Sequence, residues 1–479
     1  MAHAVDAEVV VIGAGLSGLT AAHRIQQAGI SCIILEARDR VGGKTWSIDP
    51  LNEGKVVDVG AAWINDTNQS EVYALAKSLD LELVVQNTTG RVIQEDIDGG
   101  LSTFEYGGVP NVLSEPDGVS EMLRIRSLFE ETCQTINIRD LTFADSSLDK
   151  LNLQQWIESH SSSKTALASA SVWTRAMVGM EPSEVSALYF LLYCKSGGGL
   201  LQMRKDTKDG GQYLRFVKGT QSLSLGLAAQ LHPDTLHLSS PVTSITQSVA
   251  MDSASNRVMT VTTSSKPSKT YKCHRVILSL PTPLHKSITF SPSLPEAKTA
   301  LSNSNIQGYT NKIILLYSSP WWRAARQDGP LCGLLQSFIG PITVTRDSSV
   351  DSAQQYSLTC FLVGAVGRRL SLVSQTERFA AVVDHVNRVF GKFVQVEQPL
   401  TVVEYEWTKD EWSGGCPVPV APPGVTGKYE EALRKRFGGV HFVGTETGWE
   451  WKGYMDGAVR SGKRGAEEVI EALRKSSRL

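Results

Sequence analysis

The chain has 479 residues, of which 41% are hydrophobic and 20% are charged, and its formal net charge is −2. This is the composition of an ordinary globular protein long enough for two domains, and the charge balance excludes the basic surface typical of nucleic-acid binding. The seven cysteines are scattered without C-x-x-C pairs and no stretch is apolar enough to span a membrane, which indicates a reduced compartment and no zinc or transmembrane pattern.

The strongest pattern is a strand, a glycine-rich turn and a helix over 9–27. Gly13, Gly15 and Gly18 follow the apolar strand directly at the spacing G-x-G-x-x-G. The first glycine allows a tight turn, the second lets backbone approach a pyrophosphate, and the third lets the helix pack on the strand. Glu36 ends the next predicted strand about twenty residues downstream, where an acid can accept from ribose hydroxyls. The pattern predicts a dinucleotide site at the positive end of the helix.

The segment after this unit favours FAD over NAD. A second glycine pair, Gly42 and Gly43, stands beside Arg38, Arg40 and Lys44, which provides another close backbone approach with cations for phosphate charge. This E-A-R-x-R-x-G-G run resembles the flavin-containing monoamine oxidases, of the soluble type without a membrane tail. Lys44 stands where those proteins carry an arginine, so a point charge replaces a planar fork.

The order of predicted elements continues over the whole chain. Helices are predicted over 71–81, 119–137, 148–160, 164–179 and 184–193, and strands over 91–93, 102–104, 236–238, 241–245, 275–281 and 311–317. The resemblance implies a discontinuous Rossmann-like α/β FAD-binding domain with an inserted α+β substrate-binding domain. The expected pieces are 1–83, 215–290 and 401–479 for the first domain, and 84–214 and 291–400 for the second.

Lys312 stands near the start of the apolar strand over 311–317. The resemblance implies that this lysine acts near flavin N5, where a positive group assists the reaction with oxygen. The alternative is a lysine that snorkels to the surface at a strand edge. Lys312 and Tyr454 are the candidate catalytic residues.

Cys416 ends a Ser-Gly-Gly-Cys run, where the resemblance implies a thioether to the flavin, but Pro417 follows it in place of an aromatic residue. Covalent and noncovalent FAD are therefore both open. Tyr454 matches one tyrosine of the aromatic pair that flanks the substrate amine in the family, and position 417 would hold the other. One missing ring predicts room for bulky or α-branched amines.

The resemblance also implies that the motif over 444–455 meets the ribityl, phosphate and pyrimidine groups of the flavin. The full expected cofactor set is Gly13, Gly15, Ser17, Gly18, Glu36, Ala37, Arg38, Gly42, Gly43, Lys44, Gly60, Ala61, Trp63, Val242, Trp407, Trp412, Cys416, Gly444, Thr445, Glu446, Gly453, Tyr454 and Met455.

The expected substrate residues are Tyr454, Pro417, Gln212, Arg204 and Lys205. Gln212 matches a substrate-site glutamine of the family. Arg204 and Lys205 belong to a charged run, which is either a solvated face or a basic rim that attracts an amine carrying carboxylates.

The expected activity is FAD-dependent deamination of a primary amine, bulky or long-chain and potentially carboxylate-bearing, in which amine, oxygen and water give an aldehyde, ammonia and hydrogen peroxide. An L-amino-acid oxidase and a polyamine oxidase share the fold and stay open, as does a non-catalytic flavin-binding scaffold. No metal, nucleic-acid partner or membrane span is expected, and a homodimer is an open alternative.

The last three residues, Ser477-Arg478-Leu479, resemble a peroxisomal address read by an import receptor. An oxidase that releases peroxide fits that compartment. The alternative is the basic end of a helix in a cytoplasmic protein.

Overall fold

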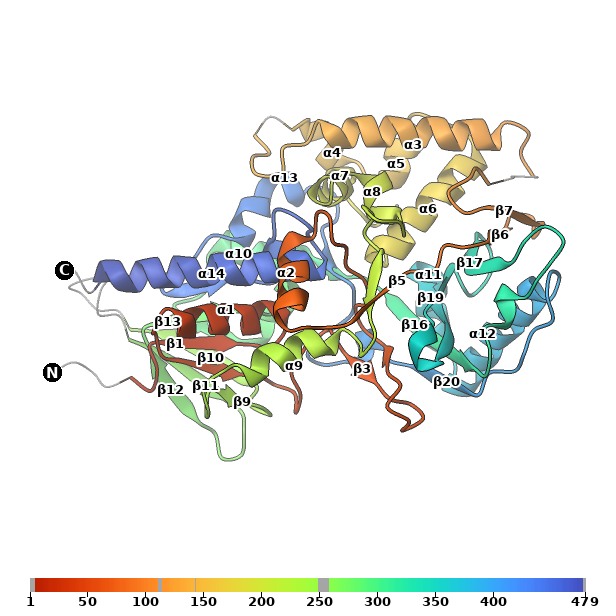
Figure 1. The fold of residues 1–479 in the computed structure, drawn as a ribbon. Coiled ribbons are helices and arrows are strands. Elements are labelled where there is room, and N and C mark those ends of the chain that lie inside the picture. The colour runs from red at the N-terminus through yellow and green to blue at the C-terminus, as the bar shows by residue number, and fades with distance from the viewer. Residues whose placement is uncertain (1–4, 111–113, 143, 249–257, 477–479) are drawn as a thin grey trace.

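The computed structural model describes residues 5–110, 114–142, 144–248 and 258–476. The described chain forms two domains, each built on its own large sheet, and it passes between them several times. In Figure 1 the first domain lies at the lower left with both termini, and the second occupies the right and the top. The tripeptide 477–479, with its predicted peroxisomal address, lies outside the described residues.

The first domain is organised around a five-stranded parallel sheet with the order β22-β13-β1-β2-β9. Its strands are β1 (Val9–Ile12), β2 (Cys32–Leu35), β9 (Leu236–His237), β13 (Arg275–Leu278) and β22 (Val440–Phe442). Every residue of β1, β13 and β22 is buried, as expected for parallel strands covered on both faces. The predicted Rossmann-like fold is confirmed.

Helices cover one face of this sheet and a four-stranded sheet covers the other. The helices are α1 (Leu16–Gln27), α2 (Ser70–Ser78), α9 (Gln221–Ala229) and α14 (Met455–Ser476). The small sheet contains β10 (Val242–Gln247), β11 (Met259–Thr263), β12 (Thr270–Cys273) and β14 (Thr289–Ser291). Helices α1 and α14 lie side by side (Figure 1). Val10 and Ile12 of β1 pack with Ile245 and Val261 of the small sheet in one core cluster.

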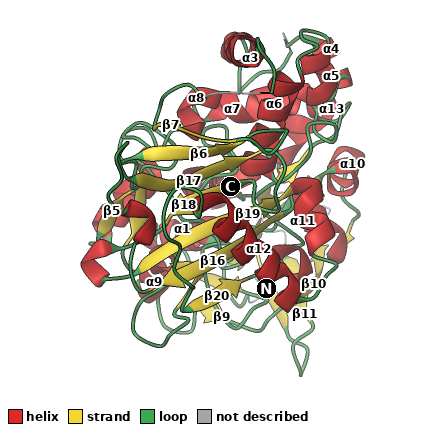
Figure 2. Cartoon of the chain, turned by 90° about the vertical axis from the view of Figure 1, so that its right-hand side faces the viewer, coloured by secondary structure: helices red, strands yellow, loops and turns green. Residues whose placement is uncertain are grey.

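The second domain contains a seven-stranded mixed sheet with the order β20-β16-β19-β18-β17-β6-β7 (Figure 2). Its strands are β6 (Arg91–Glu95), β7 (Leu101–Glu105), β16 (Thr310–Tyr317), β17 (Leu331–Ser337), β18 (Val344–Asp347), β19 (Tyr356–Val363) and β20 (Thr401–Glu404). Because β20 pairs with β16, this sheet extends to Glu404.

Two groups of helices complete the second domain. α11 (Gly364–Leu370) and α12 (Gln375–Phe390) belong to the chain between β19 and β20, and the apolar face of α12 shares a core cluster with the sheet. The helices at the top of Figures 1 and 2 are α3 (Gly118–Gln134), α4 (Ser146–Lys150), α5 (Leu153–Glu158), α6 (Lys164–Val178), α7 (Ala187–Ser196) and α8 (Leu200–Arg204). They share a core centred on the fully buried α7 residues Phe190 and Leu191.

Short elements join the domains. They are β3 (Ser47–Ile48), β4 (Val57–Asp58), β5 (Leu83–Val85), β8 (Leu214–Phe216), α10 (Glu296–Ser304), β15 (Ile306–Gln307), β21 (Pro419–Val420) and α13 (Thr426–Tyr429). β5 pairs with β8, so the chain leaves and re-enters the first domain through one two-stranded ribbon. The two predicted boundaries near 83 and 214 fall in this ribbon.

The predicted helices differ from the observed ones at capping residues. The helix predicted over 148–160 is two helices, because Asn152 accepts from the backbone N–H of Gln155 at 2.8 Å and starts α5 with a capping box. The helix predicted from Glu184 begins later, because Ser186 accepts from the N–H of Tyr189 at 3.2 Å. No helix in the described ranges is long and apolar enough to cross a membrane.

Candidate active site

A cavity of about 460 Å³ lies between the two domains and receives residues from both. From the first domain come the turn after β1, the end of β2 and the start of α14. From the second come β16, β17, β18 and the chain around α8. The cavity contains nearly all the residues predicted for the cofactor.

The glycine turn after β1 has the form that a pyrophosphate requires. A Cβ added at Gly15 would meet nothing within 4 Å, so this backbone is open toward the cavity. A Cβ at Gly13, whose φ is +98°, would lie 2.9 Å from the carbonyl of Ser279, and one at Gly18 would collide with the backbone of the turn. Gly18 is the one predicted cofactor residue outside the cavity lining, and its closeness to the turn agrees with its expected packing role.

The acid and the arginines after β2 lie beside this turn. Glu36 accepts from the backbone N–H groups of Ala14 at 2.7 Å and Arg38 at 2.9 Å, and its carboxylate lines the cavity. Arg38 lines the cavity and pairs with Asp410, whereas Arg40 lies outside the lining and donates to the carbonyls of Val41 and Gly43. The open backbone turn at a helix N-terminus and the acid beside it together fit the diphosphate and ribose groups of FAD.

The other end of the cavity is built around Lys312 of β16. Its ammonium donates to the carbonyl oxygens of Asp58 at 3.2 Å and of Gly60, and it lies 5.1 Å from the Trp63 ring centroid. A Cβ at Gly60 would meet the carbonyl of Lys44 at 2.0 Å, so only glycine fits this turn. Burial lowers the pKa of Lys312 to about 8. Lys312 is therefore a buried cation directed at the first domain, and the alternative of a snorkelling surface lysine does not apply.

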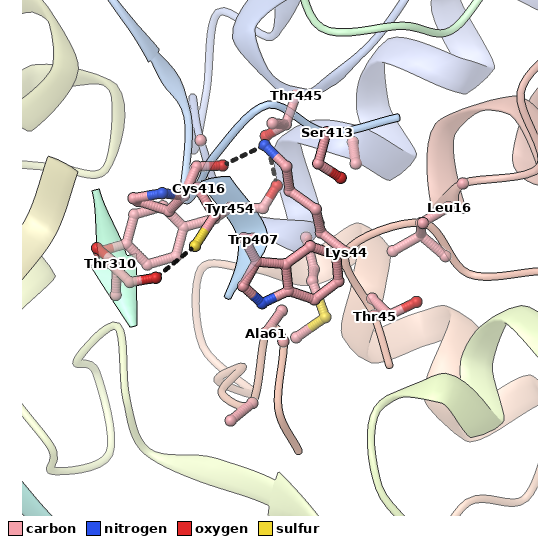
Figure 3. A pocket seen from close by; sticks show the side chains of 18 of the residues that line it. Leu16, Lys44, Thr45, Ala61, Thr310, Trp407, Ser413, Cys416, Thr445 and Tyr454 are labelled. Carbon is pink, nitrogen blue, oxygen red and sulfur yellow. Dashed lines mark hydrogen bonds between the residues drawn. The ribbon is translucent and has the colours of Figure 1, made fainter. Parts of the chain in front are cut away.

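Lys44 and Cys416 lie in the same region (Figure 3). The ammonium of Lys44 donates to the carbonyl of Pro417 at 3.1 Å, and the thiol of Cys416 donates to the carbonyl of Thr310 at 3.2 Å. Burial raises the pKa of Cys416 to about 11, against the opposing effect of the Lys44 and Lys312 charges. The thiol is therefore protonated at neutral pH.

Tyr454, Pro417 and Gln212, the residues predicted to form an amine site, all line the cavity. The Tyr454 ring packs edge-on against Trp451 at 5.0 Å, and its carbonyl accepts from the Thr445 hydroxyl at 2.6 Å. Gln212 donates through Nε2 to the carbonyl of Met203 at 2.8 Å, which leaves its buried Oε1 atom without a hydrogen-bond partner. A free amide acceptor beside one aromatic ring is suited to an N–H donor.

Charged side chains from α8, from the loop that follows it and from β18 also line the cavity. Arg204 ends α8, Arg346 lies on β18, and Asp206 follows α8. Arg346 pairs with Asp206 at 3.1 Å, and the backbone N–H of Asp206 donates to the Tyr106 hydroxyl at 3.1 Å. Arg204 lines the cavity and makes no hydrogen bond or ion pair with another described side chain.

The predicted partner of Arg204 lies elsewhere. Lys205 is outside the cavity lining, half exposed, and pairs with Asp209 at 3.3 Å. The basic face of the cavity is instead formed by Arg204 and Arg346. Sequence reasoning missed Arg346, Asp206 and Tyr106. Asp206 belongs to the same charged run as Arg204 and Lys205, so the sequence could have indicated it. Arg346 lies on strand β18, and no motif in the sequence around it indicates a functional role.

The comparisons with known proteins agree on one family. The family model described as flavin containing amine oxidoreductase matches residues 16–470. Flavin-containing amine oxidase A of Bos taurus is 32% identical over 98% of this chain and 86% of its own length. Flavin-containing amine oxidase B of Canis lupus familiaris is 30% identical, with 98% and 87% covered.

Two solved structures share the fold over nearly the whole chain. Cyclohexylamine oxidase from Brevibacterium oxydans has a TM-score of 0.87 and 27% identity, and the match covers 98% of this chain and 100% of that one. A double mutant of putrescine oxidase, made in a redesign of its cofactor binding, has a TM-score of 0.87 and 25% identity, with 97% and 99% covered.

The lowered pKa of Lys312 predicts how reoxidation of a bound reduced flavin depends on pH. Its ammonium is present below about pH 8 and is lost above it. Because a positive charge stabilises the negative charge that develops on oxygen, the reoxidation rate constant should fall as the pH rises through this value. Stopped-flow mixing of reduced enzyme with oxygen measures it. Lys312→Met should be about 100-fold slower and independent of pH over this range; a variant that reoxidises as fast as the parent contradicts the role.

Proposed function

This chain belongs to the flavin containing amine oxidoreductase family, and we propose that its substrate is a bulky or long-chain primary amine that carries a carboxylate remote from the amine. As an FAD-dependent amine oxidase it deaminates its amine oxidatively. For an unbranched primary amine, the amine, oxygen and water give an aldehyde, ammonia and hydrogen peroxide, and an α-branched amine gives a ketone in place of the aldehyde. The observation that carries the proposed substrate is the positive excess of the Arg204, Arg346 and Asp206 cluster at the substrate end of the cavity.

Each part of the cavity has a distinct task in this reaction. FAD, when bound, supplies the two-electron chemistry. Tyr454 and Gln212 orient the amine, and the buried, aromatic surroundings exclude water from it. Lys312 holds a positive charge at the opposite side, where oxygen is reduced. Pro417 has no ring to face Tyr454, which leaves room for substituents on the carbon next to nitrogen.

The excess of positive charge in this cluster favours a substrate whose remote group is an anion over one whose remote group is a second ammonium. Two guanidinium groups face one carboxylate, and Asp206 is already paired with Arg346. Burial raises the pKa of Asp206, so any protonation there would increase the excess. A desolvated guanidinium without a protein partner is suited to bidentate binding of a carboxylate. A polyamine oxidase would need free acidic groups in this place, although the likeness to putrescine oxidase keeps a diamine as the second candidate.

Replacement of Arg204 by methionine tests the proposed substrate. The variant keeps most of the stem and removes the charge, while the buried Asp206 keeps its ion pair with Arg346. We expect kcat/KM for an ω-amino carboxylate to fall about 10- to 100-fold, the worth of one charged hydrogen bond. The kcat/KM for an alkylamine without a carboxylate should change by less than about twofold. Lys205→Met is the matched control and should affect neither amine; an equal loss for both amines in Arg204→Met contradicts carboxylate binding.

The protonated Cys416 thiol supports noncovalent FAD. A thioether forms from the thiolate, and the pKa of about 11 together with the bond to the Thr310 carbonyl disfavours that form. We expect acid precipitation to release the yellow cofactor into the supernatant. Colour that stays with the precipitated protein would establish the covalent link instead.

Three further features of the chain stay predictions. The tripeptide Ser477-Arg478-Leu479 supports peroxisomal import, because a peroxide-producing oxidase fits a catalase-rich compartment. A homodimer and the functional division into FAD-binding and substrate-binding domains are likewise proposals. Fluorescence microscopy of the tagged chain with and without the tripeptide tests the first.

A further inference from the structure

The amine site has two walls that come from different loops. Pro417 lies in the loop after the Ser-Gly-Gly-Cys run, and Tyr454 lies in the loop just before α14. Both line the cavity, and each is held through its backbone carbonyl by one side chain from elsewhere. Thr445 donates to the carbonyl of Tyr454 at 2.6 Å, and Lys44 donates to the carbonyl of Pro417 at 3.1 Å.

Backbone bonds hold the chain on either side of Pro417, because the Cys416 N–H donates to the Gly308 carbonyl at 3.0 Å and the Gly308 N–H donates to the Val418 carbonyl at 3.4 Å. Lys44 adds the contact to Pro417 itself. Tyr454 is also held by ring contacts with Trp451 and Tyr193 at 5.0 and 6.3 Å. Proline has no N–H to donate and no polar side chain, so its carbonyl is the only strong hydrogen-bonding group that residue 417 offers. The bond from Lys44 is the one hydrogen bond recorded for that carbonyl among the described residues.

Lys44 itself sits on a rigid support. It follows the Gly42–Gly43 turn, whose residues have φ values of +108° and +56°. Its carbonyl accepts from the N–H of Ala61 at 2.9 Å. The backbone of Lys44 is thus joined to the turn against which the flavin ring is expected, while its ammonium reaches the amine site. Burial lowers the pKa of this ammonium, and a cation kept in such a place is costly unless it performs a specific task.

We propose that Lys44 is a positioning residue that fixes the Pro417 wall of the amine site and so sets how strongly the enzyme discriminates between unbranched and α-branched amines. A fixed wall at the reacting carbon distinguishes substrates that differ by one methyl group, whereas a mobile wall adapts to both. The proposal deepens the proposed function, since it concerns the same site, but it does not depend on the carboxylate.

Lys44→Met removes the donor and keeps most of the stem. The test compares benzylamine with α-methylbenzylamine, which differ by one methyl group on the carbon that is oxidised. Anaerobic stopped-flow reduction of the bound flavin yields both the Kd and the reduction rate constant for each amine. Because the Pro417 side leaves room for a substituent on the reacting carbon, we expect the reduction efficiency of the parent with α-methylbenzylamine to exceed that with benzylamine by about 10-fold or more. In Lys44→Met the ratio of the two reduction efficiencies should be about fivefold smaller than in the parent, and therefore closer to one.

Two variants separate positioning from a general loss of structure. Lys44→Arg keeps a cationic donor and should restore the parental ratio, at least in large part. Lys55→Met removes a lysine outside this cavity and should leave the ratio unchanged. If Lys44→Met fails to retain flavin, Lys44→Gln, which is neutral and keeps a shorter amide donor, is measured in its place.

The outcomes are distinct. A ratio in Lys44→Met within twofold of the parent, or a parent that does not discriminate between the amines, overturns the proposal. An equal loss for both amines that arginine does not rescue also overturns it, because the lysine would then support only the fold. Failure of the carboxylate proposal would appear in the Arg204→Met measurement and leave this ratio unaffected.

Discussion

The contact on which the active site depends is the one between the Lys312 ammonium and the backbone carbonyls of Asp58 and Gly60. Lys312 belongs to the sheet of the second domain, and the two carbonyls belong to the first. A buried ammonium must be hydrogen-bonded, because leaving it unpaired in a low-dielectric interior costs several kcal/mol. This requirement fixes the position of β16 relative to the turn at Gly60, and the cavity between the domains takes its shape from that relation.

The parts of the site that the sequence predicts are those where backbone geometry and chemistry impose a local pattern. Gly13, Gly15 and Gly18 can be interpreted from spacing alone, since each fills a role that another residue would block. Lys312, Cys416 and Tyr454 stand in motifs that carry the family resemblance, and all three line the cavity. The α/β fold follows from the same motifs.

The rest depends on tertiary packing that leaves no local trace. Arg346 lies on a strand whose side chains alternate between the two faces of the sheet, and only the register of β18 against β19 directs it toward Asp206. Lys205 was predicted to line the site but does not. At the end of α8 the side chain of Arg204 reaches the cavity, whereas that of Lys205 lies half exposed and pairs with Asp209. Capping by Asn152 and by Ser186 sets helix ends that apolar periodicity alone places only approximately.

The measurement that tests the proposed substrate most directly is peroxide release in air from a long-chain primary amine and from its ω-carboxylate analogue of equal length, at low and high salt. We expect peroxide from both amines, with a higher kcat/KM for the carboxylate that falls as salt rises, because the Debye length shortens from about 30 Å at 0.01 M to about 8 Å at 0.15 M. Spermidine and L-leucine should release little. The proposed substrate would be contradicted if the amine without a carboxylate has the higher kcat/KM at every salt concentration. It would also be contradicted if spermidine or L-leucine is the best substrate.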